Sequence, residues 1–348
     1  MKRLSAPFAL PPCLLLLLSA FLAAGCIGDD VSGCPSVISL TVTAEITVGV
    51  NPSADNTFNQ TGVYVFDASG VLVDYGRLVS EDGTNGQVVE LAVKEGRYTI
   101  VTWCGADFSN DYEIVVVTAS GTLTDTFAKG VTRLSDMRLR AKADRVCDTH
   151  TGNLFWNALT EVTVTGNVSQ VKLDSKLQKN SNVVEVVLKG MEETPELLQK
   201  TAFSPTRTQP AKAAAASGSR YEVRLTTVAG VYKFDNTTDT SLSQSYTYLP
   251  YEAESRDGDL YLRLRTMRLF TDIPALLTVT DRQTGGVLYS ADLIGLIMQN
   301  PAYRTQQDLD REDNYRIEIG GGAITPGAGT GITITVNGWE IVVLDPQL

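Results

Sequence analysis

The side chains best suited to covalent chemistry in this sequence of 348 residues are those of one histidine, His150, and five cysteines: Cys13, Cys26, Cys34, Cys104 and Cys147. A zinc site needs several Cys or His ligands at close spacing, and the sequence has neither a CxxC pair nor a second histidine. Nucleophilic catalysis needs a base beside the nucleophile, and His150 lies in the polar segment "CDTHTGN", which predicts an exposed turn. No GxSxG, HExxH or phosphate-loop motif occurs, so we expect no enzyme and no cofactor.

A second candidate for chemistry is the acidic run "QQDLDREDNYRIEI", which contains Asp308, Asp310, Glu312 and Asp313. Two carboxylates are enough for glycoside hydrolysis, and oxygen ligands at alternating positions suit calcium. The run lacks the glycine and the closing glutamate of an EF-hand loop, and Arg311 within it would repel a cation. We therefore predict a solvated turn that leads into a strand, with no metal site.

The first 25 residues have the organisation of a secretory signal peptide. Two basic residues come first, Leu14–Leu18 form an apolar centre, and small residues run up to Gly25. Small residues directly before a cysteine resemble the lipobox of bacterial lipoproteins. The resemblance implies cleavage after Gly25 and a diacylglyceryl thioether on Cys26, so residues 26–36 are expected to be a lipidated tether.

The expected mode of membrane attachment is lipid. Each buried CH₂ group contributes about 0.8 kcal/mol, so one acyl chain holds a protein only marginally and several, such as palmitate, are needed. No later stretch approaches the length of about 18 apolar residues that a membrane helix requires. Asp29 and Asp30 resemble the export signal of surface lipoproteins in gut and oral anaerobes, which would place the protein on the outer membrane surface. A plain solvated linker is the alternative reading of the two acids.

The remaining cysteines predict one disulfide. Cys13 is removed with the leader and Cys26 carries lipid, which leaves Cys34, Cys104 and Cys147 in an exported protein. An odd number predicts one disulfide and one free thiol, and the sequence leaves the pairing open.

The charge of the chain excludes a class of partners. The net charge is −11, and removal of two basic residues with the leader leaves 27 basic against 40 acidic residues, or −13. Such a protein would repel phosphate, and no basic patch with interleaved aromatic residues appears, so no nucleic acid is expected as a partner.

The elements that must position these residues are mainly strands. "SLTVTAEITVGV" (39–50) alternates apolar and polar residues, and "GVYVFDASGVLVDYG" (62–76) reads as two strands around a hairpin turn. "QVVELAVKEGRYTIVTWC" (87–104) predicts two more strands, and similar runs recur to residue 344. The fold class is therefore mainly β, as two tandem β-sandwich domains, 37–160 and 161–348.

Other signals are few. Short helices are predicted at 192–200 and at 290–300, the latter with Ser290 as N-cap. The low-complexity segment 204–220 has hardly any large apolar residue and predicts an exposed, flexible loop. In "ITITVNGWEIVVL" the apolar phase changes at Asn337-Gly338, which predicts a hairpin turn or a bulge.

Five pieces of the sequence together resemble one family. "CIGDDVSGCP", "VYVFDASGVLV", "GRYTIVTWCG", "LDREDNYRIEI" and "ITVNGWEI" resemble, in this order, FimB-type fimbrial anchor lipoproteins of gut and oral anaerobes. The resemblance implies two transthyretin-like β-sandwich domains, no enzymatic activity and fimbrial shaft subunits as partners. It further implies a cell-adhesion role, which is holding the base of a fimbrium (a pilus) on the outer membrane and limiting its length by β-strand complementation.

One feature favours an anchor over a shaft subunit. In related shaft subunits a protease cuts after an early arginine and releases the lipidated strand. Here no Lys or Arg occurs from Cys26 to Gly76, and Arg77 is the first, so the tether should persist. The alternatives are a fimbrial shaft or tip subunit, or a surface lipoprotein that binds glycans through the aromatic residues Tyr246, Tyr248 and Tyr251.

Overall fold

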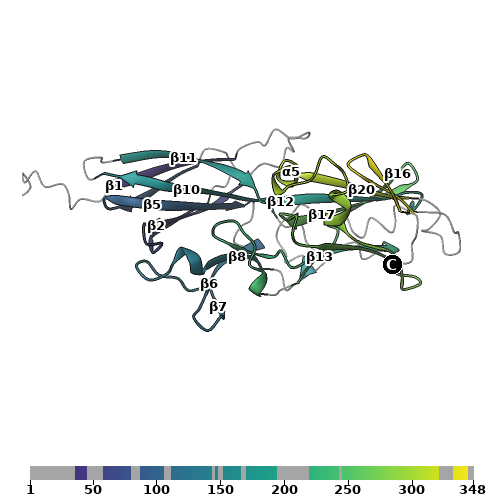
Figure 1. Ribbon diagram of the computed structural model, residues 1–348, viewed down its shortest axis with the longest axis horizontal. Helices are drawn as coiled ribbons and strands as arrows, with labels where there is room; N and C mark the ends of the chain where they lie inside the picture. The colour runs from purple at the N-terminus through teal and green to yellow at the C-terminus, as the bar shows by residue number, and fades with distance from the viewer. Residues whose placement is uncertain are drawn as a thin grey trace, which may run out of the picture.

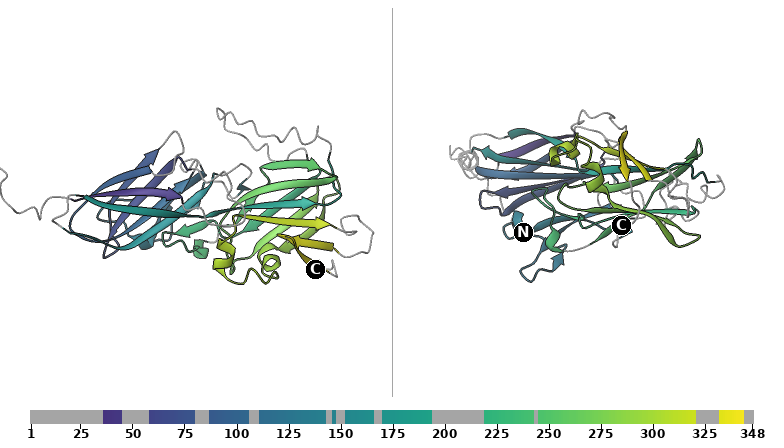
Figure 2. Two further views of the ribbon diagram at one scale, coloured as in Figure 1. Left: turned by 90° about the horizontal axis from the view of Figure 1, so that it is seen from above. Right: turned by 45° about the vertical axis from the view of Figure 1, so that its right-hand side comes forward.

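A computed structural model describes residues 36–44, 58–79, 87–105, 111–142, 146–147, 152–165, 170–193, 219–242, 245–320 and 332–343. Within these ranges the chain is built mainly of strands, which confirms the predicted fold class. Two β-domains lie end to end along the long axis (Figure 2).

The first domain is one curled sheet. Its strand order is β3-β2-β5-β10-β11-β1-β4. The members are β1 (Ser36–Ala44), β2 (Gln60–Asp67), β3 (Leu72–Val79), β4 (Gln87–Val93), β5 (Gly96–Gly105), β10 (Leu154–Val164) and β11 (Gln170–Lys179). The edge strands β3 and β4 meet, because a Cβ added to Gly76 would lie 3.0 Å from a methyl group of Leu91. The sheet thus encloses a core that includes Ile38, Leu40 and Phe58.

The second domain is a sandwich of two sheets. The six-stranded sheet, in the order β16-β17-β12-β20-β21-β22, contains β12 (Ser181–Leu188), β16 (Glu252–Arg256), β17 (Asp259–Met267), β20 (Asn314–Gly320), β21 (Ile332–Val336) and β22 (Trp339–Val343). The five-stranded sheet, in the order β19-β18-β13-β15-β9, contains β9 (Val146–Cys147), β13 (Tyr221–Thr227), β15 (Tyr246–Tyr248), β18 (Ala275–Asp281) and β19 (Gly286–Asp292). Alternate residues of both sheets, such as Val184 and Leu277, fill the core between them.

A fourth sheet joins the two domains. Its order is β14-β8-β6-β7, made of β6 (Tyr112–Val117), β7 (Leu123–Thr124), β8 (Met137–Ala141) and β14 (Val231–Lys233). β14 comes from the second half of the chain, and it pairs with β8 from the first half. Here Tyr232 stacks on Trp103 with ring centroids 6.3 Å apart, and the Trp156 indole N–H donates to the Phe234 carbonyl at 3.2 Å. One continuous apolar core therefore crosses the junction.

The first sheet of the structure extends beyond the domain boundary that the sequence predicted. The predicted division between residues 160 and 161 falls inside β10, and the first sheet continues through β11 to Lys179. Asn180 alone separates β11 from β12, so one nearly continuous extended segment runs from the first domain into the second (Figure 1). Gly166 and Asn167 lie outside the described residues, and the strands before and after them, β10 and β11, belong to the same sheet.

Helices are short, as predicted, but one begins later than expected. Among the described residues they are α4 (Leu293–Ile297), α5 (Gln306–Asp310) and two 3₁₀ turns, Leu134–Asp136 and Thr240–Leu242. Ser290 is not the N-cap of α4, because β19 continues through Asp292. The Asp292 carboxylate accepts from the backbone N–H groups of Ile294 and Gly295 and caps the helix instead. Most of the helix predicted at 192–200 lies outside the described residues.

Candidate functional site

The first strand is internal to its sheet. β1 pairs in parallel with β11 on one side and antiparallel with β4 on the other. Ile38, Leu40 and Val42 alternate with more polar residues, and their side chains have no exposed surface. The predicted strand began at residue 39 and ended at 50; the structure begins it at Ser36, and residues 45–57 lie outside the described part. β1 is therefore held by hydrogen bonds on both edges and by its side chains.

Arg77, the first basic residue after Cys26, is also part of the sheet. It lies in β3, where it pairs with Gly62 of β2. Its guanidinium donates to the Gln60 side chain at 3.5 Å. A protease that needs an unpaired, extended segment meets a hydrogen-bonded strand at this position.

Two of the candidate disulfide cysteines can be placed. Cys104 is a free thiol at the end of β5, fully buried, and its Sγ donates to the Thr61 hydroxyl at 3.4 Å. Burial raises the pKa of Cys104 well above its usual value, so the thiol is unreactive in the folded protein. Cys147 is buried in β9 at the junction. Cys34 lies outside the described residues, as do Cys26, the cleavage site after Gly25 and His150, so the disulfide and the lipidation stay predictions.

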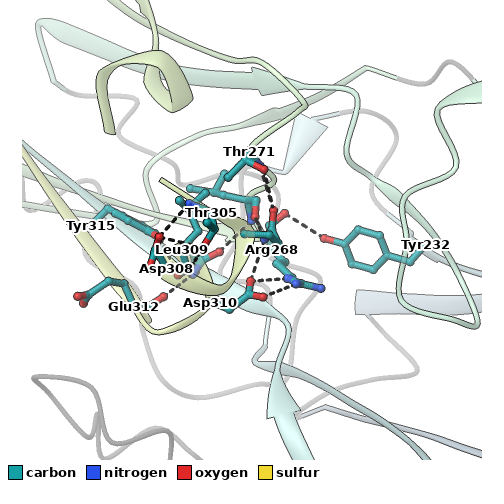
Figure 3. A network of polar contacts seen from close by, with 12 residues as sticks. Tyr232, Arg268, Thr271, Thr305, Asp308, Leu309, Asp310, Glu312 and Tyr315 are labelled. Carbon is teal, nitrogen blue, oxygen red and sulfur yellow. Dashed lines mark hydrogen bonds and ion pairs between the residues drawn. The ribbon is translucent and has the colours of Figure 1, made fainter. Parts of the chain in front are cut away.

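The acidic run at 308–313 is folded against the protein by ion pairs and hydrogen bonds (Figure 3). Asp308 forms a capping box with Thr305 at the start of α5 and pairs with Arg311 at 2.6 Å. Asp310 accepts two hydrogen bonds from the guanidinium of Arg268. Each of these carboxylates thus serves local structure.

The other two acids of the run have partners as well. Glu312 accepts from the hydroxyl of Tyr303 at 3.2 Å, and Asp313 pairs with Lys179 at 3.4 Å. Among the described residues, no group of His, Cys, Asp or Glu side chains is arranged to hold a metal ion.

A cleft of about 820 Å³ lies beside this run, at the junction end of the second domain. Its floor is the outer face of the six-stranded sheet, with Glu185 and Arg263, and Tyr303 stands on one side. Sequence reasoning missed the cleft, because its lining comes from segments between residues 179 and 337 that only the fold brings together.

Charged side chains on the cleft floor form a ladder across four strands. Arg263 of β17 contacts Glu252 of β16 at 3.0 Å and Glu185 of β12 at 2.9 Å. Glu185 contacts Arg316 of β20 at 3.0 Å, and Arg316 contacts Glu318 at 2.7 Å. Each charge of this ladder therefore has an oppositely charged partner. The ladder covers the outer face of the sheet with paired charges.

Two of the three tyrosines predicted to bind glycans are buried, so the prediction is wrong for them. Tyr246 and Tyr248 are each only 1% exposed, because their side chains point into the core from β15. Tyr251 alone lines the cleft. The set of three tyrosines that the sequence suggested is therefore not brought together on one surface.

The C-terminal strands form the predicted hairpin. Asn337 and Gly338 have φ angles of 48° and 78°, which is the left-handed conformation that a tight two-residue hairpin turn requires. β22 pairs with β21 on one side and is the last strand of its sheet. Trp339, at its start, is 46% exposed. The tail therefore pairs internally, and no other described strand pairs with the outer edge of β22.

No helix among the described residues is long and apolar enough to cross a membrane.

Comparison with known proteins gives consistent matches. Residues 31–345 match the family described as fimbrillin-A associated anchor proteins Mfa1 and Mfa2. The minor fimbrium anchoring subunit Mfa2 of Porphyromonas gingivalis is 25% identical over 298 residues, which cover 81% of this chain and 79% of the relative.

Solved structures share the fold. The fimbrial anchor protein Mfa2 from Porphyromonas gingivalis matches with a TM-score of 0.64 at 20% identity and covers 89% of this chain and 99% of its own. A DUF1812 protein from Bacteroides thetaiotaomicron also matches with a TM-score of 0.64 at 20% identity, over 90% of this chain and all of its own. The internal first strand, the joined β-domains and the family match over nearly the whole length lead to one conclusion: this chain belongs to the fimbrillin-A associated anchor proteins of the Mfa1 and Mfa2 family.

Proposed function

We propose that this protein is a lipid-tethered anchor subunit that holds the base of a fimbrium on the outer membrane surface. The family match supports the fimbrial role, and the lipobox-like sequence before Cys26 supports the tether. The observation that carries the proposal is the state of the first strand. β1 is buried and paired on both sides, and the 51 residues from Cys26 to Gly76 contain no Lys or Arg at which a trypsin-like protease could remove it.

A retained first strand also explains how the protein would limit fimbrial length. A subunit that keeps its own strand has no vacant groove in the first domain for the strand of another subunit. Shaft subunits would then join only at the second domain, where the open edge of β22 could accept an added strand. Addition at one end alone makes this subunit a terminus and not a repeating unit.

Palmitate labelling tests the tether. Cys26→Ala should lose the label, whereas Cys34→Ala, which removes a cysteine only eight residues away, should keep it. Equal labelling of wild type and Cys26→Ala would refute lipid attachment at this residue.

Deletion of the gene tests the anchoring role. We expect overlong or shed fimbriae, and complementation with the wild-type chain should restore attached fimbriae of normal length. Normal fimbriae in the deletion strain would rule the role out.

The proposed edge can be tested separately. Trp339→Glu places a charge on the exposed start of β22 and should reduce co-purification of shaft subunits. Val131→Glu is the matched control, because Val131 is 74% exposed and lies far from β22 in the sequence, in the loop before β8. Equal loss of shaft protein in both variants would argue against the β22 edge.

A further inference from the structure

The direction of β1 has a mechanical consequence if the protein is an anchor, so this inference rests on the proposed function. β1 starts at Ser36, and Val37 pairs with Gln170 at the beginning of β11. β11 then runs toward the second domain, and Lys179 at its end is followed by Asn180 and β12. The start of β1 therefore lies at the pole of the first domain that is remote from the second, as the position of β1 in Figure 1 also shows. The tether enters at that pole.

The pulling force of the fimbrium would act at the opposite end of the molecule, on the second domain. β12 is a central strand of the six-stranded sheet, with β17 and β20 on its two sides. It continues β11 with one residue between them. A fimbrium bound to the second domain would thus pull on β11 along its length, while the membrane pulls on the N-terminal end of β1 in the opposite direction.

This geometry loads the β1 ladders in shear. β1 has eight aligned residue pairs with β11 and seven with β4, along nine residues, or about 30 Å of strand. In shear, all hydrogen bonds along the strand carry the load together, so they must break almost at once. In a sideways pull they would break one at a time, each worth only about 1 kcal/mol.

Side chains add to this resistance. Ile38, Leu40 and Val42 are fully buried in the core of the first domain. Sliding β1 along its axis would drag all three across their packing sites before any of them is released, whereas peeling frees them in turn. Close packing makes such a slide costly, because the surrounding side chains interdigitate.

We infer that β1 is the load-bearing strand of this protein: it works as a shear clamp that passes tension between the lipid tether and the fimbrium. A lipidated chain whose first strand peeled sideways would open under much less force. The parallel pairing of β1 with β11 is the feature that prevents peeling, because it puts the point of attachment at the far end of the ladder.

Single-molecule pulling tests the clamp on the full mature chain, with Cys26→Ala and Cys34→Ser to leave only buried native thiols. One handle is ligated to the N-terminus. In the axial arm the second handle is on Asp257→Cys, in the β16–β17 turn, which lies beside the end of β12 that is remote from the first domain. In the sideways arm it is on Glu95→Cys, an exposed residue in the turn after β4, beside Ser36. The first domain is the same in both arms.

We expect the first domain to rupture at a several-fold higher force in the axial arm at equal loading rate. The released length identifies the event. Because β6–β9 belong to the other sheets, opening of the first sheet alone frees residues 36–105 and 154–179, which are 96 residues or roughly 350 Å at about 3.6 Å each. Opening of residues 36–95 frees 60 residues, or roughly 200 Å. Equal forces, or a higher force in the sideways arm, would overturn the inference.

The outcome is independent of the anchoring tests. A weak axial force would refute the clamp and leave the palmitate and deletion results standing. Loss of the anchoring role in those tests would leave a strong β1 ladder without a load. Identical thermal unfolding of the two handle variants and wild type verifies that the added cysteines have not changed the fold.

Discussion

The burial of β1 predicts how strongly one small substitution opens the first domain. Val42 is fully buried in β1, whereas Val88 in the adjacent strand β4 is 49% exposed. At both sites Val→Ala shortens the side chain by two carbon atoms and lowers the intrinsic preference for strand by the same amount. The two substitutions therefore differ mainly in burial.

The magnitude follows from the buried area and the cavity. Deleting one buried methylene costs about 0.5–1.5 kcal/mol, so Val42→Ala should lower the free energy of unfolding by about 2 kcal/mol. Val88→Ala should lose no more than about 1 kcal/mol, because half of the removed surface was already in water.

Alkylation of Cys104 measures the opening of this domain. Cys104 shares the core with Val42, and its thiol reacts only when the domain opens. Since about 1.4 kcal/mol is a tenfold change in an equilibrium, labelling should accelerate about 30-fold in Val42→Ala and about fivefold or less in Val88→Ala. The rate is read from the peptide that contains Cys104. Equal acceleration in the two variants would show that β1 is not part of the cooperative core, and the reasoning would fail.

Two further predictions concern the second domain. Arg220 donates two hydrogen bonds to the Asp281 carboxylate, at 2.7 Å and 3.1 Å. These bonds are the main reason that the pKa of Asp281 is lowered from its usual 3.8 to about 2. The ionised Asp281 carboxylate therefore stabilises the folded protein above pH 4, and this contribution is lost as the pH falls toward 2. The difference in urea midpoint between wild type and Asp281→Asn should shrink over that range. A constant difference would contradict the pairing. Gly230→Ala should destabilise the domain by about 1–3 kcal/mol, because the new Cβ would overlap the ring of Tyr246. Gly286→Ala, whose Cβ meets only the Thr284 hydroxyl at 3.3 Å, should be nearly neutral in the same urea titration.

Local features were largely predictable because their causes are local. The hairpin at 62–76 formed as expected, with Asp67 accepting from the N–H groups of Ser69 and Val71 and with Gly70 at a φ of 77°. The turn at Asn337-Gly338 formed for the same reason. A turn residue acts on the backbone within a few positions, so its effect can be read from the sequence.

Strand partners were not predictable. β4 and β5 are consecutive and separated only by Lys94 and Glu95, yet β4 pairs with β1 and β5 with β2 and β10. Tyr64 and Phe66 of β2 face a core that includes Phe234, far along the chain, so β2 is buried on both sides and shows no alternation. The low-complexity segment 204–220 also ends in structure, because the buried Ser219 donates to Glu193.

The sequence by itself predicted the strand-built fold, which the structure confirms, and it predicted export and a lipidated cysteine, which stay predictions; signal order, period-two alternation and turn residues are properties of short segments. Only the tertiary structure decided that β1 lies inside the sheet, that the first domain extends to Lys179 and that β14 joins the halves. Backbone hydrogen-bonding groups are the same in every residue, so pairing is chosen by which arrangement buries all apolar faces at once. That global requirement places β1 inside its sheet, which is the position on which the shear-clamp proposal rests.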